Sequence, residues 1–194
     1  MTTIIVGLLG SKGHGKSTAA DYLVKEFGYV ELSFARPLKN IVKEVFTMSE
    51  DQVNNPDYKE KIDERWGVSP RELLQVIGTD LFRDGLRTAC PSLESKDSIW
   101  ITNLKYRLEA LPTGSRVVIS DVRFPEEATF LQSLGCILLR IQRPSISDTA
   151  TTRTQHASET QSANIVVDGT VVNDGTKVQL CTRVYEALNK VLFG

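Results

Sequence analysis

Near its start the sequence reads Ile4-Ile5-Val6-Gly7-Leu8-Leu9 and continues with Gly10-Ser11-Lys12-Gly13-His14-Gly15-Lys16-Ser17-Thr18. The first run is apolar, as expected of a buried strand, and the second contains the pattern G-x-x-x-x-G-K-[ST]. Glycines let such a loop turn its backbone amides inward and approach a polyphosphate closely. A helical pattern follows directly, from Lys16 to Phe27. This order of strand, loop and helix predicts a phosphate-binding loop.

The residues of this loop have distinct predicted roles. Lys16 brings a positive charge to the β- and γ-phosphates, which makes it a candidate catalytic residue, and the Ser17 hydroxyl is a candidate ligand for Mg²⁺. The pattern therefore predicts a nucleoside triphosphate bound with Mg²⁺. The residues predicted to bind this triphosphate are Gly10, Gly13, His14, Gly15, Lys16, Ser17 and Thr18.

Composition narrows the class of protein. The chain has 194 residues, of which 41% are hydrophobic and 24% charged, values typical of a globular domain with a sizeable core. Its formal net charge of -1 argues against an overall field that would hold nucleic acid or an anionic membrane. The three cysteines form no C-x-x-C motif, which favours neither a disulfide framework nor a zinc site. Since the first residues resemble neither a signal peptide nor a membrane span, we expect a cytoplasmic protein.

Apolar runs alternate with helical patterns along most of the chain. This alternation predicts an α/β fold in which helices cover both faces of a parallel sheet. We expect one domain over residues 1–194. The predicted strands are Ile4–Leu9, Tyr29–Phe34, Arg116–Ser120, Cys136–Gln142 and Asn164–Val167.

The segment between the second and third strands is too long for a simple crossover helix. It contains helical patterns near Pro37–Phe46, Pro70–Arg87 and Lys96–Leu111, and we interpret the charged run Asp57–Arg65 among them as a solvated helix face. The segment Ser145–Thr154, rich in Ser and Thr, is expected to be a loop that closes over a site. The last helix is expected over residues 175–193, with these residues buried: Val178, Cys181, Val184, Leu188 and either Val191 or Leu192.

Cationic residues follow the predicted strands at their carboxyl ends, where open parallel sheets bind ligands. Arg36 and Lys39 follow the second strand, Arg123 the third and Arg143 the fourth. A single arginine in such a place is usually a surface salt-bridge partner. Several beside a phosphate-binding loop suit a site for two phosphorylated ligands, because the guanidinium group binds phosphate through paired hydrogen bonds.

Three further residues are candidates for the chemistry. Asp121 directly follows the third strand, where a carboxylate holds Mg²⁺ through water or orients the attacking group; capping of the next turn is its alternative role. Arg143 and Arg153 are candidates to neutralise charge in the transition state when the polar loop closes.

Several stretches carry a further signal through their order and spacing: Gly10–Thr18, Ser33–Lys39, Leu74–Arg83, Trp100, Ser120–Ala128, Arg140–Pro144, His156–Glu159 and Asn173–Thr176. In these the sequence resembles the deoxynucleoside monophosphate kinases of tailed bacteriophages. The resemblance covers most of the chain. It implies a P-loop NTPase fold of three α/β/α layers with a five-stranded parallel sheet, a helical substrate-binding insertion at about 35–112 and a lid at about 144–160.

The same resemblance implies a reaction and a set of acceptor contacts. The γ-phosphoryl group of ATP would pass to a 2′-deoxynucleoside 5′-monophosphate, in the host cytoplasm if a phage encodes the protein. Lys39, Arg83 and Arg123 would hold the acceptor's phosphate or base. Phe34 and Trp100 would stack near the base, although core packing is the alternative for both aromatic residues. We expect no polymeric nucleic acid and no membrane as partner, and the oligomeric state, a homodimer included, stays open.

Two other functions remain open at this point. Animal phosphomevalonate kinases share much of this architecture, but His156–Glu159 and the run Gly78-Thr79-Asp80-Leu81-Phe82-Arg83 favour the nucleotide kinase. A regulatory P-loop GTPase is less well supported, because the N-K-x-D motif common in guanine-selective GTPases is missing: Asn189-Lys190-Val191-Leu192 lacks the acid.

Overall fold

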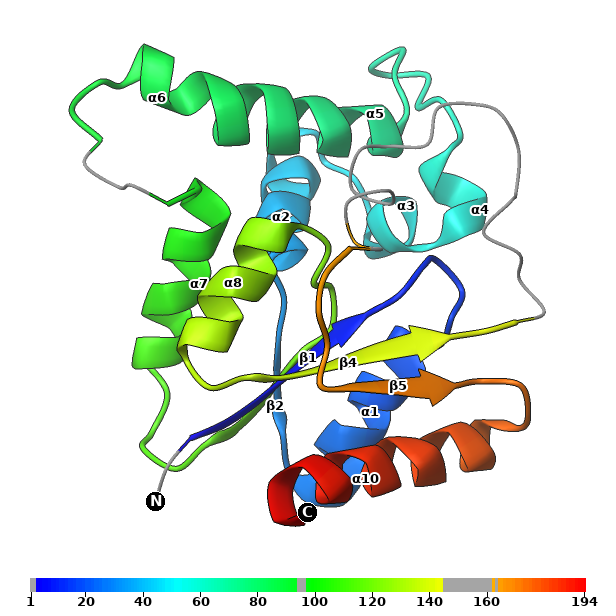
Figure 1. Cartoon of the computed structure of the whole chain (residues 1–194). Helices are drawn as coiled ribbons and strands as arrows, with labels where there is room; N and C mark the ends of the chain where they lie inside the picture. The colour runs from blue at the N-terminus through cyan, green and yellow to red at the C-terminus, as the bar shows by residue number, and fades with distance from the viewer. Residues whose placement is uncertain (1–2, 94–96, 145–161, 163) are drawn as a thin grey trace. The chain divides into compact units, whose positions relative to one another are not determined.

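The computed structural model describes residues 3–93, 97–144, 162 and 164–194 (Figure 1). The chain divides into two compact units. The first consists of Met1–Ser33 and Glu109–Gly194, and the second of Phe34–Leu108. Within the described residues, no helix combines the length and the apolar character that a membrane crossing requires.

The first unit is built on a five-stranded parallel sheet with the strand order β2-β3-β1-β4-β5. Strand β1 lies in the middle, and its Gly7 pairs with Ile119 of β3 and with Leu138 of β4. Since all strands are parallel, their carboxyl ends meet at one edge. The strands are β1 (Ile4–Leu9), β2 (Val30–Leu32), β3 (Arg116–Ile119), β4 (Ile137–Gln142) and β5 (Gly169–Val172).

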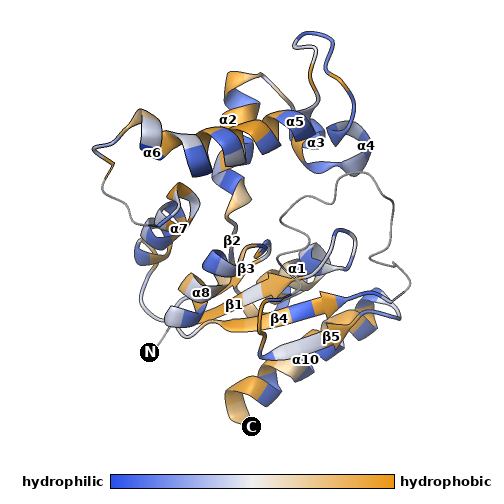
Figure 2. Ribbon diagram, turned by 45° about the horizontal axis from the view of Figure 1, so that its top comes forward, coloured by the Kyte–Doolittle hydropathy of each residue, from blue (hydrophilic) through white to orange (hydrophobic). Residues whose placement is uncertain are grey.

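Helices cover both faces of this sheet. Helices α1 (Lys16–Phe27) and α10 (Lys177–Phe193) pack together on one face, and α8 (Pro125–Ser133) lies on the other (Figure 1). Figure 2 shows that hydrophobic residues dominate the central strands, as expected for strands buried on both sides. The core on the α1 and α10 side includes Val6, Leu8, Leu23, Leu139, Val184 and Leu188. The predicted three-layer α/β/α fold with five parallel strands is confirmed.

The predicted position of the last strand is wrong. Residues 164–167 form no strand; Val166 is 79% exposed, and β5 begins instead at Gly169. Asp168 sets this register, because its backbone N–H donates to Leu138 O at 2.9 Å and its carboxylate accepts from Leu138 N at 2.7 Å. The apolar run therefore leads into the strand without joining the ladder.

The expected buried face of the last helix is also partly wrong. Leu180, Val184 and Leu188, spaced four residues apart, are the buried side chains of α10. Val178 is 73% exposed, and Val191 and Leu192 are exposed as well. An apolar pattern fixes the helical period, but the contacts with α1 and β5 decide which stripe is buried.

The second unit is helical. It contains α2 (Ala35–Val45), α3 (Glu50–Asn54), α4 (Pro56–Lys59), α5 (Pro70–Gln75), η1 (Val76–Gly85), α6 (Leu86–Ala89) and most of α7 (Ile99–Glu109). The helix predicted over 70–87 is continuous but changes character, since η1 is a π-helix. A separate core holds this unit together, formed by Val42, Met48, Val53, Leu74 and Ile77.

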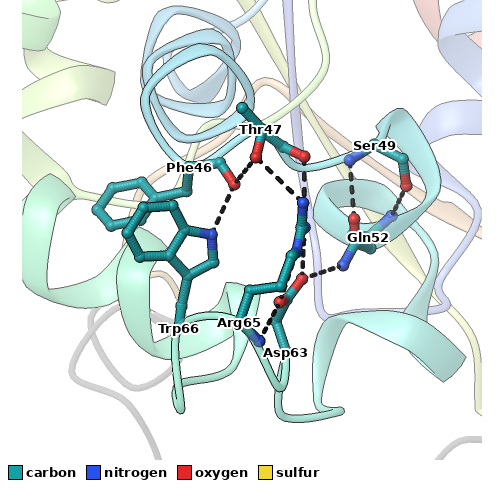
Figure 3. A network of polar contacts seen from close by, with 7 residues as sticks. All are labelled: Phe46, Thr47, Ser49, Gln52, Asp63, Arg65 and Trp66. Carbon is teal, nitrogen blue, oxygen red and sulfur yellow. Dashed lines mark hydrogen bonds and ion pairs between the residues drawn. The ribbon is translucent and has the colours of Figure 1, made fainter.

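The interpretation of the charged run 57–65 as one solvated helix face is wrong, because only its first residues are helical, in α4. Asp63 is buried and binds both ends of the Arg65 guanidinium group, with Nε at 2.9 Å and a terminal nitrogen at 2.7 Å (Figure 3). Gln52 Nε2 donates to the same carboxylate at 2.8 Å, and Trp66 Nε1 donates to Phe46 O at 2.9 Å. The run therefore folds back as a turn that hydrogen bonds connect to the middle of α3 and to the end of α2.

Candidate functional site

The register of the sheet brings several predicted residues to one edge of the first unit. The phosphate-binding loop leaves the end of β1, and Asp121 lies in the turn directly after β3, the strand that pairs with β1 up to Gly7 and Ile119. Arg143 directly follows Gln142, the last residue of β4. The donor half of the predicted site, including Lys16 and Ser17, thus lies at the carboxyl edge of the sheet, where parallel α/β sheets bind their ligands.

The loop has the backbone conformation that its glycines predict. Gly10, Gly13 and Gly15 have φ angles of 136°, 84° and 106°, values that side-chain-bearing residues rarely adopt. Space is also restricted, because a Cβ atom at Gly10 would collide with the carbonyl oxygen of Ile141. The close approach of the loop to β4 therefore requires glycine at position 10 for two separate reasons.

The ammonium group of Lys16 lies against the phosphate-binding loop. Its Nζ donates to the carbonyl oxygens of Gly10 at 2.5 Å and of Ser11 at 2.9 Å. Helix α1 begins at Lys16, so the exposed Ser17 side chain is in the first turn, followed by the half-buried Thr18. The N-terminus of a helix favours anions through its unpaired amides and its dipole, which suits a phosphate at this place.

The His14 side chain connects the loop to β4. It is 4% exposed, and its Nδ1 donates to Ile141 O at 3.1 Å. The backbone oxygen of His14 accepts from Asn173 Nδ2 at 3.0 Å. Asn173 lies in the stretch Asn173–Thr176 that carries the family resemblance, but the sequence predicted no role for it at the loop; the strand before it had been predicted at 164–167.

The turn after β3 is held by a buried carboxylate. Glu127 is 2% exposed, and its Oε2 accepts from the backbone N–H groups of Arg123 at 2.9 Å and Phe124 at 3.1 Å. The Arg123 side chain is exposed, whereas its backbone is fixed. Ser120, the residue before Asp121, donates from its Oγ to Glu31 Oε1 at 2.5 Å. The sequence predicted no role for Glu127, which lies in the stretch Ser120–Ala128, or for Glu31.

Four of the predicted substrate-binding residues belong to the second unit: Phe34, Lys39, Arg83 and Trp100. Lys39 on α2 and Arg83 on η1 are half-buried. Trp100 is buried, its indole N–H donates to Gly78 O at 2.9 Å, and its ring lies 5.5 Å from that of Phe82. The packing of Trp100 joins α7 to η1, and its role at a base stays a prediction.

Part of the predicted lid lies outside the described residues. Arg153 and the run His156–Glu159 fall within 145–161, so the position of the lid arginine stays a prediction from sequence.

The carboxyl edge of the sheet carries oxygen donors of the kind that Mg²⁺ prefers. Over the part of the chain that the structure describes, no three or more His, Cys, Asp or Glu side chains cluster as a metal cage. A magnesium ion that accompanies a polyphosphate needs few protein ligands, since phosphate oxygens and water complete its shell. The Ser17 hydroxyl and the Asp121 carboxylate are oxygen donors at the correct edge, so the residues present fit the ion.

Comparison with known proteins gives the following matches. No family model matches the chain. Over 165 residues the chain is 43% identical to a protein of Acanthamoeba polyphaga mimivirus named "Putative deoxynucleotide monophosphate kinase", an alignment that covers 84% of this chain and 83% of the relative. The solved structure of TT1252 from Thermus thermophilus matches with a TM-score of 0.54 and 18% identity over 100% of both chains, which shows a shared fold alone. Shikimate kinase from Aquifex aeolicus has a TM-score of 0.49 and 12% identity over 98% of this chain and 100% of the other, a likeness too low to argue from.

Proposed function

Because the chain belongs to the deoxynucleotide monophosphate kinase family, we propose that it transfers the γ-phosphoryl group of ATP to a 2′-deoxynucleoside 5′-monophosphate. The products are ADP and a deoxynucleoside diphosphate. The observation that carries this proposal is the 43% identity to the mimivirus protein over most of both chains. The glycine conformations and the Lys16 contacts of the phosphate-binding loop support the binding of the triphosphate.

The transfer needs no covalent intermediate with the protein. An oxygen of the acceptor phosphate forms a bond to the γ-phosphorus, while the bond from that phosphorus to the β–γ bridging oxygen breaks and ADP leaves. Both reactants are anions, so the protein must offset their repulsion and hold them in line. Lys16 offers its charge to the β- and γ-phosphates from the loop.

Mg²⁺, when bound, shields the phosphate oxygens and stabilises the charge that develops during transfer. Ser17 and Asp121 are the residues proposed to hold it. Asp121 reaches this edge because it follows β3, the neighbour of the strand that carries the loop. Arg143, exposed just beyond β4, and Arg153 of the predicted lid are proposed to stabilise the transferring phosphoryl group.

We propose that the acceptor nucleotide is bound by the residues that the sequence predicts for it. Arg123 of the first unit and Lys39 and Arg83 of the second are proposed to bind its phosphate or base, because a dianionic phosphate calls for more than one cation. Phe34 and Trp100 are proposed to border the base. The backbone of Arg123 is prepared for this role by Glu127, which fixes the turn before substrate binds.

An acceptor panel tests the proposal. Purified protein, ATP and Mg²⁺ are incubated with each of the four common deoxynucleoside monophosphates and with modified pyrimidine deoxynucleotides, and the diphosphate product is separated by chromatography. We expect turnover of at least one acceptor, and a loss of roughly 100-fold or more in kcat for Lys16→Ala. Turnover of phosphomevalonate instead, or rapid GTP hydrolysis without any acceptor, would contradict the proposal.

A further inference from the structure

The connection between β5 and α10 reaches the phosphate-binding loop through one side chain. Asn173 directly follows β5 and is 7% exposed. Its side-chain Nδ2 donates to the backbone oxygen of His14 at 3.0 Å, across a large sequence separation. Its own backbone N–H donates to Gln142 O at 2.7 Å, which ties it to the end of β4. The backbone of Asn173 is thus fixed to β4, and its side chain is bonded to the phosphate-binding loop.

The bonded peptide is the one that enters Gly15. In a planar trans peptide the C=O and the following N–H point in opposite directions. When Asn173 fixes the oxygen of His14 on the sheet side, the N–H of Gly15 is turned away from the sheet. That is the direction in which a phosphate-binding loop presents its amides to the ligand.

Close packing restricts this arrangement further. A Cβ atom built on Gly15 would lie only 2.8 Å from Asn173 Nδ2 and 2.9 Å from a methyl group of Leu180. Gly15 also has a φ angle of 106°, which no ordinary side chain favours. Position 15 therefore requires glycine, because the space that a side chain would need is occupied by the amide group of Asn173, which donates the hydrogen bond to the loop.

We propose that Asn173 is a positioning residue for the triphosphate, which it serves by fixing the orientation of the His14–Gly15 peptide. Asn173 itself does not contact the reacting atoms in this role. The inference rests on the proposed function, in which ATP binds the loop. It adds the conclusion that nucleotide affinity depends on a side chain contributed by the end of β5.

The variant Asn173→Asp tests the hydrogen bond with almost no change of shape. The introduced carboxylate has no proton to donate and faces the oxygen of His14, so it repels the atom that the amide attracts. We expect the dissociation constant for ATP with Mg²⁺, measured by isothermal titration calorimetry at pH 8, to rise about tenfold or more. The variant Asn173→Ala loses the donor without adding repulsion, and we expect a smaller rise.

A pH series separates this role from a general weakening of the fold. Burial raises the pKa of a carboxyl group, and once protonated the introduced group again has a proton for the oxygen of His14. The ratio of the Asn173→Asp dissociation constant to that of the unchanged protein should therefore fall toward one between pH 8 and pH 5. His14, Arg143 and the Asp174–Arg183 ion pair face or flank this place in all the variants. The Asn173→Ala series contains these groups without the introduced carboxyl group, so it measures their own effect on affinity. The Asn173→Ala ratio should stay constant.

A matched control lies at the other end of the same two strands. Asp168→Ala removes a side-chain acceptor for the backbone N–H of Leu138 in β4, as the Asn173 variants remove a side-chain donor for the backbone of the loop. It should lower the melting temperature and leave the affinity for ATP unchanged.

The outcomes distinguish this inference from the proposed function. If the unchanged protein binds ATP and phosphorylates a deoxynucleotide, but Asn173→Asp has the same affinity at every pH, Asn173 has no positioning role. The same conclusion follows if Asp168→Ala weakens ATP binding equally, or if the loss in Asn173→Asp does not depend on pH. If the unchanged protein binds no ATP, the proposed function itself fails.

Discussion

At the scale of single residues, the phosphate-binding loop depends on backbone positions as much as on Lys16. Gly10 combines a left-handed φ angle with a contact that leaves no room for a Cβ atom. His14, predicted as an ATP-binding residue, has its side chain buried against Ile141, so any contact with ATP falls to its backbone. The motif predicted His14 as part of the loop, whereas the structure shows that its side chain packs into the protein interior.

Gly10→Ala should therefore impair nucleotide binding. The added methyl group meets the carbonyl oxygen of Ile141, and the strained backbone costs about 1–3 kcal/mol. We expect ATP affinity to fall below detection in calorimetry. Gly28→Ala is the matched control, because Gly28 also has a positive φ angle but has open space around its Cβ position. It should cost about 1–2 kcal/mol in stability and leave ATP affinity intact. Equal losses of affinity in both variants would show that strain alone, and not the contact with β4, is responsible.

Glu127 is expected to act on acceptor binding through Arg123. Glu127→Ala leaves the N–H groups of Arg123 and Phe124 without their buried acceptor, which should destabilise the fold by about 1–3 kcal/mol. Glu127→Gln keeps an accepting oxygen and should be milder. In steady-state kinetics we expect the KM for the deoxynucleotide to rise several-fold in Glu127→Gln while the KM for ATP holds. A parallel rise of both KM values would argue against a specific role for the turn.

At the scale of elements, most strands and helices follow from local patterns, and the exceptions have long-range causes. The ends of β1 and α1 match the predicted ranges, because an apolar run, a glycine loop and the αL residue Gly28 mark them locally. The start of β5 depends on Asp168 and its bonds to Leu138, which no local pattern contains. The folded turn at 57–65 likewise depends on Asp63 finding Gln52 and Arg65.

The Asp63 turn should make the second unit sensitive to acid. The Arg65 guanidinium group holds the pKa of Asp63 well below its usual range, so the carboxylate stabilises the folded state above the pKa of about 3.9 that it has when unfolded. That stabilisation is lost as the pH falls from this value toward the folded pKa. Asp63→Asn should lower the urea midpoint of the second unit at pH 7, and the difference from the unchanged protein should shrink below about pH 4.

Tryptophan fluorescence measures this effect, because Trp66 and Trp100 are the two tryptophans of the chain and both belong to the second unit. Glu64→Gln is the control, since Glu64 is an exposed acid in the same charged run. Its midpoint should match that of the unchanged protein at every pH. If Asp63→Asn behaves in the same way, the turn does not depend on the ion pair.

At the scale of the whole molecule, the sequence predicted the fold and the elements that carry the candidate residues, whereas the roles of those residues in donor and acceptor binding stay predictions. Parallel strands place the loop, Asp121, Arg123 and Arg143 at one edge, so spacing alone was sufficient for them. Lys39 and Arg83 come from α2 and the π-helix η1, whose packing rests on tertiary contacts around Val42 and Leu74. Asn173 and Glu127 lie in stretches that carry the family resemblance, but the sequence predicted no role for them, because they bind backbone atoms whose positions only the fold determines.

The division into two units predicts a stepwise pattern of protection on ligand binding. ATP with Mg²⁺ at about 100 times its dissociation constant stabilises the state that binds it by about 2.7 kcal/mol. In amide hydrogen exchange we expect ATP alone to protect residues 10–18 and the segment around Asn173, both in the first unit. A deoxynucleotide added next should protect the turn at Arg123 and, in the second unit, the helices that carry Lys39 and Arg83. A ribonucleoside without phosphate serves as the control and should protect neither helix. If the deoxynucleotide protects only the first unit, Lys39 and Arg83 are not acceptor ligands, and the cations at the sheet edge must bind both phosphates.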